Sequence, residues 1–275
     1  MKKVLISVCI LMAAACFLIG WKEQAEADVY TAPGWERVDL STVLEQEDWG
    51  EEEYRLLFYQ TGYSRRAIEA IPKAERKEKL LQAQHAFFLE PTIGCSRNSI
   101  ITWQEENTNE LLPEIVGIEE GDILVSFCAH TYGWRNGHTA IVVDAKAGKT
   151  LEAVLMGQDS CIQNVQKWRK YPSFIILRLK DASREERREI ANYAVEHMEG
   201  VPYGFLTDVL EHFWRGDAKG GDTDCSHLIW KSFYEFGYDL DSDGGVIVTP
   251  RDIAESPLLE VIQVYGIDME TVREN

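Results

Sequence analysis

Residues 138–155 read HTAIVVDAKAGKTLEAVL, and this stretch decides the fold class. Its first half, His138–Ala145, is an apolar run of the kind that forms a buried strand, and Thr150–Leu155 is a second run of this kind. Only a short segment that ends at Gly148 separates the two runs. They are therefore predicted to pair as an antiparallel hairpin within an antiparallel sheet.

Two further apolar runs flank this hairpin, Gly121–Phe127 and Ser173–Leu179, and both are predicted as strands. Helical patterns follow along the chain. Ser183 and Glu186 form a capping box that begins one helix, and this helix is expected to end at Gly200. The remaining helices are predicted near Phe205–Phe213 and over Cys225–Gly237.

The N-terminal third is predicted to be helical. Glu51–Gly62 carries acidic residues in its first turn, an apolar stripe and a terminal glycine. Two further helical patterns end before Pro72 and at Pro91. Helices, then strands, then helices predict an α+β fold in which an antiparallel sheet packs on helices. Residues 28–112 are assigned to a helical N-terminal extension, and residues 113–275 to the main domain.

Cys225 is the candidate nucleophile. It follows two glycines and three potential cap residues, and it stands in the first turn of a predicted helix. The unpaired N–H groups and the positive end of the helix dipole favour a thiolate, which is the nucleophilic form of cysteine. The same N–H groups are expected to hold an oxyanion. A small buried core residue is the alternative interpretation.

A thiolate nucleophile needs an imidazole within hydrogen-bond reach. His138 opens a buried strand directly after Gly137, which leaves an open approach to a rigidly held base. His130 is predicted to lie in a loop, and His227, two residues after Cys225 on one helix, points about 200° away from it. His138 is therefore the candidate base, and a hydrogen-bonded structural histidine is the alternative interpretation.

Glu152 is the candidate for the residue that orients the imidazole. It is a lone carboxylate in an apolar strand, and an unpaired buried charge is costly, so a partner is expected. If the hairpin turn centres near Ala145, Glu152 lies opposite His138 on the same face of the sheet. If the turn centres between residues 147 and 148, Val143 takes that place. The sequence leaves both registers open.

The three other cysteines after the leader have no comparable setting. Cys95 and Cys161 fall in predicted polar loops, and Cys128 ends a predicted strand. No two cysteines have the CxxC spacing, so a structural zinc site is not expected. If Cys225 is a free thiol, these three form at most one disulfide.

One acidic segment resembles half of a calcium-binding loop. Asp239, Asp241, Asp243 and Gly244 have the spacing of such a loop, but its twelfth position, a bidentate Glu, is Pro250. The segment is therefore interpreted as an acidic turn, and neither a metal nor a cofactor is expected.

Residues 1–27 are predicted to form a secretory signal peptide. Two lysines precede the apolar run Val4–Gly20, and Ala25-Glu26-Ala27 offers a cleavage site before Asp28. An uncleaved anchor and a lipoprotein cleaved before Cys16 are the alternatives. Each places the rest of the chain outside the cytoplasm, and after cleavage no stable membrane insertion is expected.

The amino-acid composition and the net charge indicate which kinds of partner to expect. The chain has 275 residues, of which 45% are hydrophobic and 27% charged, as in ordinary globular proteins. Its 46 acidic residues outnumber its 28 basic ones, and the formal net charge is −18. Binding to nucleic acid draws on an excess of Lys and Arg, so nucleic acid is not an expected partner.

Six motifs, in order, resemble those of the YiiX-type branch of the NlpC-like cysteine hydrolases. They read GDILV, WRNGHTAIVVD, TLEA, VPYG, TDCSHLIWKSFYEFG and VTPRDIAESPLLEVI, within residues 113–262. The family is papain-like with a circularly permuted order, in which the histidine strand precedes the nucleophile helix. The resemblance implies Cys225 as the nucleophile, His138 as the base and Glu152 as the third polar residue. It also implies that Tyr203 lines the site near the oxyanion. His227 stands where many relatives have a small residue or glycine.

These observations together predict a secreted cysteine hydrolase that cleaves an amide bond of a small peptide or acyl-amide substrate. The resemblance makes a cell-wall peptide the first candidate, since the wider family cleaves such peptides. An anionic wall would repel so acidic a protein, which leaves a lipid-like acyl compound as the alternative. A non-catalytic binding protein that keeps the papain-like fold is the rival interpretation.

Overall fold

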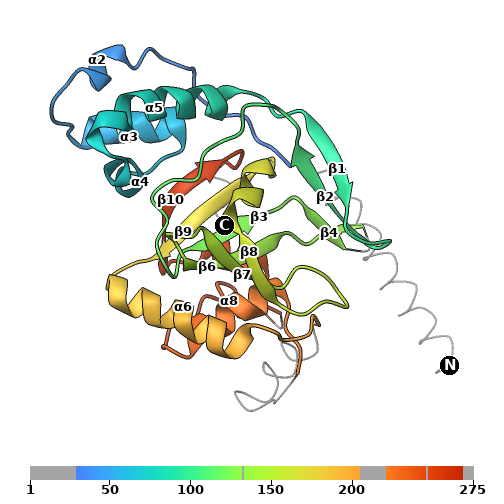
Figure 1. Ribbon diagram of the computed structural model, residues 1–275. Coiled ribbons are helices and arrows are strands. Elements are labelled where there is room, and N and C mark those ends of the chain that lie inside the picture. The colour runs from blue at the N-terminus through green and yellow to red at the C-terminus, as the bar shows by residue number, and fades with distance from the viewer. Residues whose placement is uncertain (1–28, 132, 205–220, 246, 269–275) are drawn as a thin grey trace, which may run out of the picture.

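The computed structural model describes residues 29–131, 133–204, 221–245 and 247–268. The predicted signal peptide and the predicted helix near Phe205–Phe213 lie outside the described residues. A six-stranded sheet forms the centre (Figure 1), with the strand order β10-β9-β3-β6-β7-β8 and antiparallel pairing throughout. Its strands are β3 (Ile123–Ser126), β6 (His138–Asp144), β7 (Lys149–Glu152), β8 (Cys161–Asn164), β9 (Phe174–Leu179) and β10 (Leu259–Tyr265). The predicted α+β class and its antiparallel sheet are confirmed.

A second antiparallel sheet has the order β1-β2-β4-β5. Its strands are β1 (Ile93–Arg97), β2 (Thr102–Asn107), β4 (Ala129–Thr131) and β5 (Trp134–Arg135). The prediction of helix throughout residues 28–112 is wrong here, because β1 and β2 pair as a hairpin. These two strands are mostly exposed or half-buried, so they carry little of the apolar pattern from which strands are predicted. Three residues that were expected in loops lie in strands: Cys95 in β1, His130 in β4 and Cys161 in β8.

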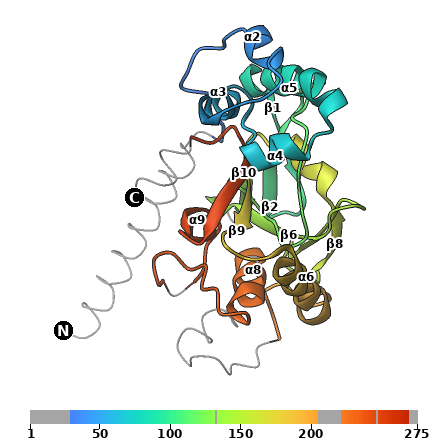
Figure 2. The same ribbon diagram turned by 90° about the vertical axis from the view of Figure 1, so that its left-hand side faces the viewer.

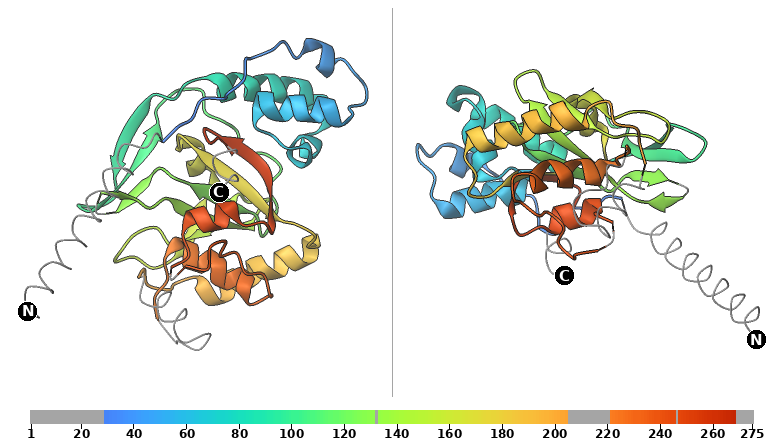
Figure 3. Two further views of the ribbon diagram at one scale, coloured as in Figure 1. Left: turned by 180° about the vertical axis from the view of Figure 1, so that it is seen from behind. Right: turned by 90° about the horizontal axis from the view of Figure 1, so that it is seen from below.

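Helices cover both faces of the six-stranded sheet (Figures 1 and 2). One face packs on α3 (Glu51–Thr61), α4 (Arg65–Ala70) and α5 (Lys73–Phe88), which follow the short α2 (Ser41–Leu44). The other core contains α6 (Arg184–Met198), α8 (Cys225–Tyr234) and α9 (Pro250–Glu255). The 3-10 helix η1 (Val165–Lys170) connects β8 to β9. Figure 3 shows the N-terminal helices at one end of the molecule, and α6 and α8 at the other.

Strand β6 contributes to both cores. Ala140 and Val142 belong to the cluster with the N-terminal helices, and Ile141 belongs to the cluster with α6 and α8. Successive strand residues point to opposite faces, so a strand that is covered on both sides needs an almost continuous apolar sequence. This is the physical reason for the HTAIVVD run, and it places His138 on the same face as Ala140.

Several helix ends follow the sequence signals. Gly62 ends α3 with φ of +72°, and a Cβ there would lie 2.0 Å from the carbonyl oxygen of Val264. Only glycine therefore lets β10 pass so close to this helix. The Ser183 side chain accepts the Glu186 N–H at the start of α6. None of the helices in the described ranges is both long and apolar enough to cross a membrane.

Candidate active site

The structure brings Cys225, His138 and Glu152 together from three elements. Cys225 is the first residue of α8, His138 the first of β6, and Glu152 the last of β7. His138 Nε2 lies 2.6 Å from Glu152 Oε2, and the imidazole also hydrogen-bonds the Cys225 thiol. Since the carboxylate occupies Nε2, Nδ1 is the ring nitrogen that remains for the sulfur. The three side chains therefore form a continuous carboxylate–imidazole–thiol chain.

The hairpin register differs from both predicted alternatives. Ile141 pairs with Leu151, and a bulge shifts the ladder by one residue nearer the turn. Continued by one residue, this register places Ala140 opposite Glu152. His138 is then the diagonal neighbour of Glu152 on the same face of the sheet, within reach of a long side chain. A bulge adds a residue to one strand only, and the residues of the turn do not reveal it.

Three further side chains hold the fully buried Glu152 carboxylate. Thr150 donates its hydroxyl to Oε1 at 2.6 Å, and Trp168 donates its indole N–H to the same oxygen at 3.1 Å. The Lys167 ammonium lies 2.7 Å from Oε2. The Trp168 ring also stacks on His138, with the ring centroids 5.4 Å apart. The sequence analysis missed all three, because a buried carboxylate predicts a partner without saying which one.

The charges of this group stabilise one another. Burial alone would lower the pKa of the His138 imidazole, but its hydrogen bonds to Cys225 and Glu152 outweigh burial and raise that pKa to about 9. Burial alone would raise the pKa of the Glu152 carboxyl. The hydrogen bond from His138 and the charge of Lys167 outweigh burial here too, and lower that pKa to about 2. At neutral pH the site therefore holds a carboxylate and an imidazolium, and an imidazolium beside a sulfur favours the thiolate.

The start of α8 differs from the expectation in one respect. Asp224 is its N-cap, and its Oδ1 accepts the N–H groups of Ser226 at 2.8 Å and His227 at 3.0 Å. Two of the N–H groups that were expected to hold an oxyanion are therefore used by the cap. The Cys225 N–H makes no hydrogen bond to any other described residue, so it is the donor at this helix end that remains for an oxyanion.

Cys225 lies in the wall of a cavity of about 740 Å³. Tyr203, which was expected near the oxyanion, lies in the same wall. Burial, and then the negative charges of Cys225 and Asp224, raise the pKa of the Tyr203 phenol, so it keeps its proton at neutral pH. The other apolar side chains of the wall include Phe127, Trp134, Ile247, Val248 and Pro250.

The other thiols of the described residues have different surroundings. All four cysteines, Cys95, Cys128, Cys161 and Cys225, are free. Burial raises the pKa of the Cys128 thiol to about 12, and burial with the nearby Glu105 also raises that of Cys95. Neither thiol is therefore predisposed to form a thiolate at neutral pH.

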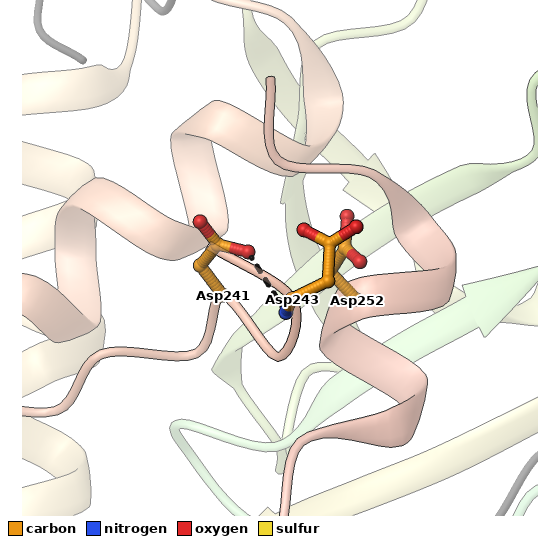
Figure 4. Close-up of side chains that lie close together, drawn as sticks. All are labelled: Asp241, Asp243 and Asp252. Atoms are coloured by element: carbon orange, nitrogen blue, oxygen red, sulfur yellow. Dashed lines mark hydrogen bonds between the residues drawn. The ribbon is translucent and has the colours of Figure 1, made fainter. Parts of the chain in front are cut away.

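One group of carboxylates has the geometry to hold a cation. Asp241, Asp243 and Asp252 converge (Figure 4), with oxygens that lie within 4.8 Å of one another. The first two belong to the acidic turn, and Asp252 comes from α9 and was not singled out in the sequence. Asp252 accepts the N–H and the hydroxyl of Thr249 at the start of α9, and Asp241 accepts the Gly244 N–H. These bonds are those of a helix cap and a turn.

Comparisons with known proteins find distant relatives. No family model matches the chain. The uncharacterized protein YycO of Bacillus subtilis (strain 168) is 30% identical over 129 residues, which are 46% of this chain and 49% of YycO. The chain thus spans about half the length of this curated relative. Among solved structures, the crystal structure of metalloprotein yiiX from Escherichia coli O157:H7 (DUF1105) matches with a TM-score of 0.41 and 16% identity, over 52% of this chain and 96% of that one.

Proposed function

We propose that this chain is a cysteine hydrolase of amide or related acyl bonds, with a papain-like site in the circularly permuted order. The hydrogen-bonded chain from Glu152 through His138 to Cys225, at the wall of a cavity, carries the proposal. A purely structural histidine is satisfied by its carboxylate. His138 also contacts a thiol, that of Cys225 at the N-terminus of α8, and this arrangement activates a nucleophile.

In the proposed reaction, the Cys225 thiolate attacks the carbonyl carbon, and the carbonyl oxygen becomes an oxyanion. The Cys225 N–H and the neutral Tyr203 phenol are the proposed donors to that oxygen. His138 gives its Nδ1 proton to the leaving nitrogen as the C–N bond breaks, and a thioester remains on Cys225. Water then gives a proton to His138 and attacks the thioester, which releases the acid and restores the enzyme. Glu152 keeps the imidazole oriented throughout.

The cavity wall supports a substrate with an apolar group beside the scissile bond. Aromatic and aliphatic side chains contribute much of this wall, beside polar ones such as Asn136 and Thr249. Arg135 and Arg251 also lie in the wall, but both are paired. Glu105 accepts both terminal N–H groups of Arg135 at 3.0 Å, and Glu255 accepts an N–H group of Arg251 at 3.1 Å. A cell-wall peptide with free carboxylates would need cations that are not already paired. An acyl-amide with an apolar acyl group is therefore the better supported substrate class, and a wall peptide the second.

Hydrolysis of graded substrates tests this function. N-acyl p-nitroanilides of increasing acyl length are compared with a peptide anilide that carries two carboxylates. We expect the longer acyl chains to be cleaved fastest, an acyl adduct on Cys225 by mass spectrometry, and no turnover by Cys225→Ser. Cys161→Ser, a half-buried thiol in β8, is the matched control and should behave as the wild type. Turnover that survives in Cys225→Ser refutes the mechanism. The absence of both turnover and adduct favours the binding-protein interpretation.

We also propose that the protein acts outside the cytoplasm, from the apolar run Val4–Gly20 and the Ala25-Glu26-Ala27 motif. N-terminal sequencing of material from the culture medium is expected to begin at Asp28. An intact leader, or lipid on Cys16, would contradict cleavage at this site.

A further inference from the structure

The Lys167 ammonium binds the same oxygen of the Glu152 carboxylate as the His138 imidazole does. The Lys167 Nζ and the His138 Nε2 both bind Oε2 of this carboxylate, at 2.7 Å and 2.6 Å, while the other oxygen accepts only neutral donors. The ammonium and the imidazole therefore share one oxygen. Two cationic groups that share an oxygen at these distances lie within about 5 Å of each other, close enough to interact strongly in a buried site.

Hydrogen bonds of the neighbouring backbone fix the position of Lys167 beside Glu152. Lys167 lies on η1, where the Asn164 side chain accepts the Gln166 N–H, and the Val165 N–H bonds the Gly148 carbonyl at the β6–β7 turn. The next residue on this short helix is the buried Trp168, whose indole reaches the same carboxylate. The Lys167 side chain is 29% exposed, so its stem is largely covered while part of it meets solvent.

We propose that Lys167 is a positioning residue for the triad, whose ammonium balances the buried Glu152 charge and limits how strongly this carboxylate holds the His138 imidazolium. The inference rests on the proposed function. In the thiolate–imidazolium state, Glu152 and Cys225 carry two negative charges and His138 one positive charge. Lys167 makes the group neutral, whereas without it one uncompensated negative charge stays buried, which is costly.

The other titratable groups near the triad do not take over this role. Tyr171 is fully buried, and burial, followed by the negative charge of Glu152, raises its pKa well above the usual value, so it stays neutral. Asp224 lies beside Cys225, and burial raises the pKa of its carboxyl; a carboxyl group brings no positive charge in either form, so it cannot replace the Lys167 ammonium. Among the groups described as bound to Glu152, Lys167 is the one that brings an ammonium group.

The direction of the expected pKa shifts follows from the positive charge of the Lys167 ammonium. Removal of a cation near His138 and Cys225 makes the imidazolium easier to keep and the thiolate harder to form. Both titrations therefore move to higher pH in Lys167→Met. For unit charges about 5 Å apart, discounted for partial exposure, the expected shift is about one pH unit. Lys167→Arg keeps the charge and should titrate near the wild type.

Two measurements test the proposal. The first is the rate of iodoacetamide alkylation of Cys225 against pH, read by mass spectrometry. The second is the NMR titration of the His138 ring in a Cys225→Ser background, which does not depend on the thiol. Lys170→Met removes an exposed lysine from the same helix and is the matched control, expected to leave both midpoints unchanged. Lys167→Gln keeps a hydrogen-bond donor without the charge, and it serves as the second variant if Lys167→Met does not fold.

The outcomes separate the two proposals. An upward shift in Lys167→Met and Lys167→Gln, with rescue by Lys167→Arg, supports Lys167 as the charge that sets the triad. Midpoints that match the wild type in both uncharged variants overturn it, even if Cys225 is reactive. If Cys225 of the wild-type protein is alkylated no faster than Cys95, the proposed function fails, and the His138 titration still decides whether Lys167 controls the imidazole.

Discussion

Two histidines of this chain have closely similar surroundings but differ in their contact with a thiol. His138 has its Nε2 2.6 Å from Glu152, and His130 has its Nε2 3.0 Å from Glu105. Both rings are buried, lie on strands and stack on a tryptophan, and both carboxylates also bind a cation. Nδ1 of His138 remains for the Cys225 thiol, whereas the buried Nδ1 of His130 has no partner among the described residues.

The comparison teaches that a carboxylate–histidine pair does not by itself make an active site. The same pair serves as a structural link in the four-stranded sheet and as part of a candidate triad in the six-stranded one. The cations differ too: Arg135 binds both oxygens of Glu105, while Lys167 binds one oxygen of Glu152. In both pairs the cation and the imidazole share one carboxylate oxygen, and Arg135 binds the second oxygen of its carboxylate as well.

The largest expected difference concerns the histidines themselves. His138→Ala should slow iodoacetamide alkylation of Cys225 at pH 6 by on the order of ten- to a hundredfold, because the imidazolium that stabilises the thiolate is lost. His130→Ala should change the rate little. Circular dichroism of both variants controls for folding. Equal slowing in the two variants would show that the pairs are not distinguished by their contact with the thiol.

The next comparison is between the carboxylates of Glu152 and Glu105 and their effect on the pH dependence of activity. The pKa of His138 is about 9, so activity should fall on the alkaline side near that pH. Glu152→Gln removes the charge that holds the imidazolium, so this limb should move to lower pH, opposite to the shift expected for Lys167→Met. Glu105→Gln should leave the limb in place. A pH profile of p-nitroanilide hydrolysis measures all three, and an unshifted limb in Glu152→Gln would contradict the orienting role of this carboxylate.

Stability should depend on pH through the same pair. The pKa of His138 is raised on folding, so its stabilising contribution is complete below about pH 6.5, its unfolded pKa. That contribution is lost as the pH rises through about 9. The pKa of Glu152 is lowered, so its contribution is present above about pH 4.5. It is lost as the pH falls through about 2. Denaturant unfolding of the wild type from pH 6 to 9 should show a falling free energy, and a flatter dependence in Glu152→Gln. Parallel curves would refute this linkage.

The smallest expected difference concerns the tryptophans. Trp168→Phe removes a hydrogen bond to a fully buried carboxylate, which should lower the free energy of unfolding by about 1–3 kcal/mol. Trp103 is only half-buried, and Trp103→Phe keeps an aromatic ring against His130, so its effect should be under about 1 kcal/mol. Denaturant midpoints at neutral pH compare the two, and equal losses would argue against a special role for the Trp168 indole.

Much of the fold and of the candidate site was readable in the sequence because it depends on local signals. The apolar run from His138 predicts a doubly covered strand, and the glycine and serine at helix ends predict where helices stop and start. Cys225 at a helix start, His138 at a strand start and Glu152 in an apolar strand were each singled out by position. Strands β1 and β2 were missed because exposed strands lack an apolar alternation.

The contacts between distant segments depend on the packing of the whole molecule. The bulge in the β6–β7 hairpin makes Glu152 a diagonal partner of His138, and no residue of the turn encodes that extra position. Lys167 and Trp168 contact Glu152 from a separate helix. The sequence does not indicate which of the several lysines of the chain binds that carboxylate. Residue types and periodicity indicate which buried polar groups need a hydrogen-bond or charge partner. Which partner each receives depends on the packing of whole elements, because the contacts are made across the sheet and not along the chain.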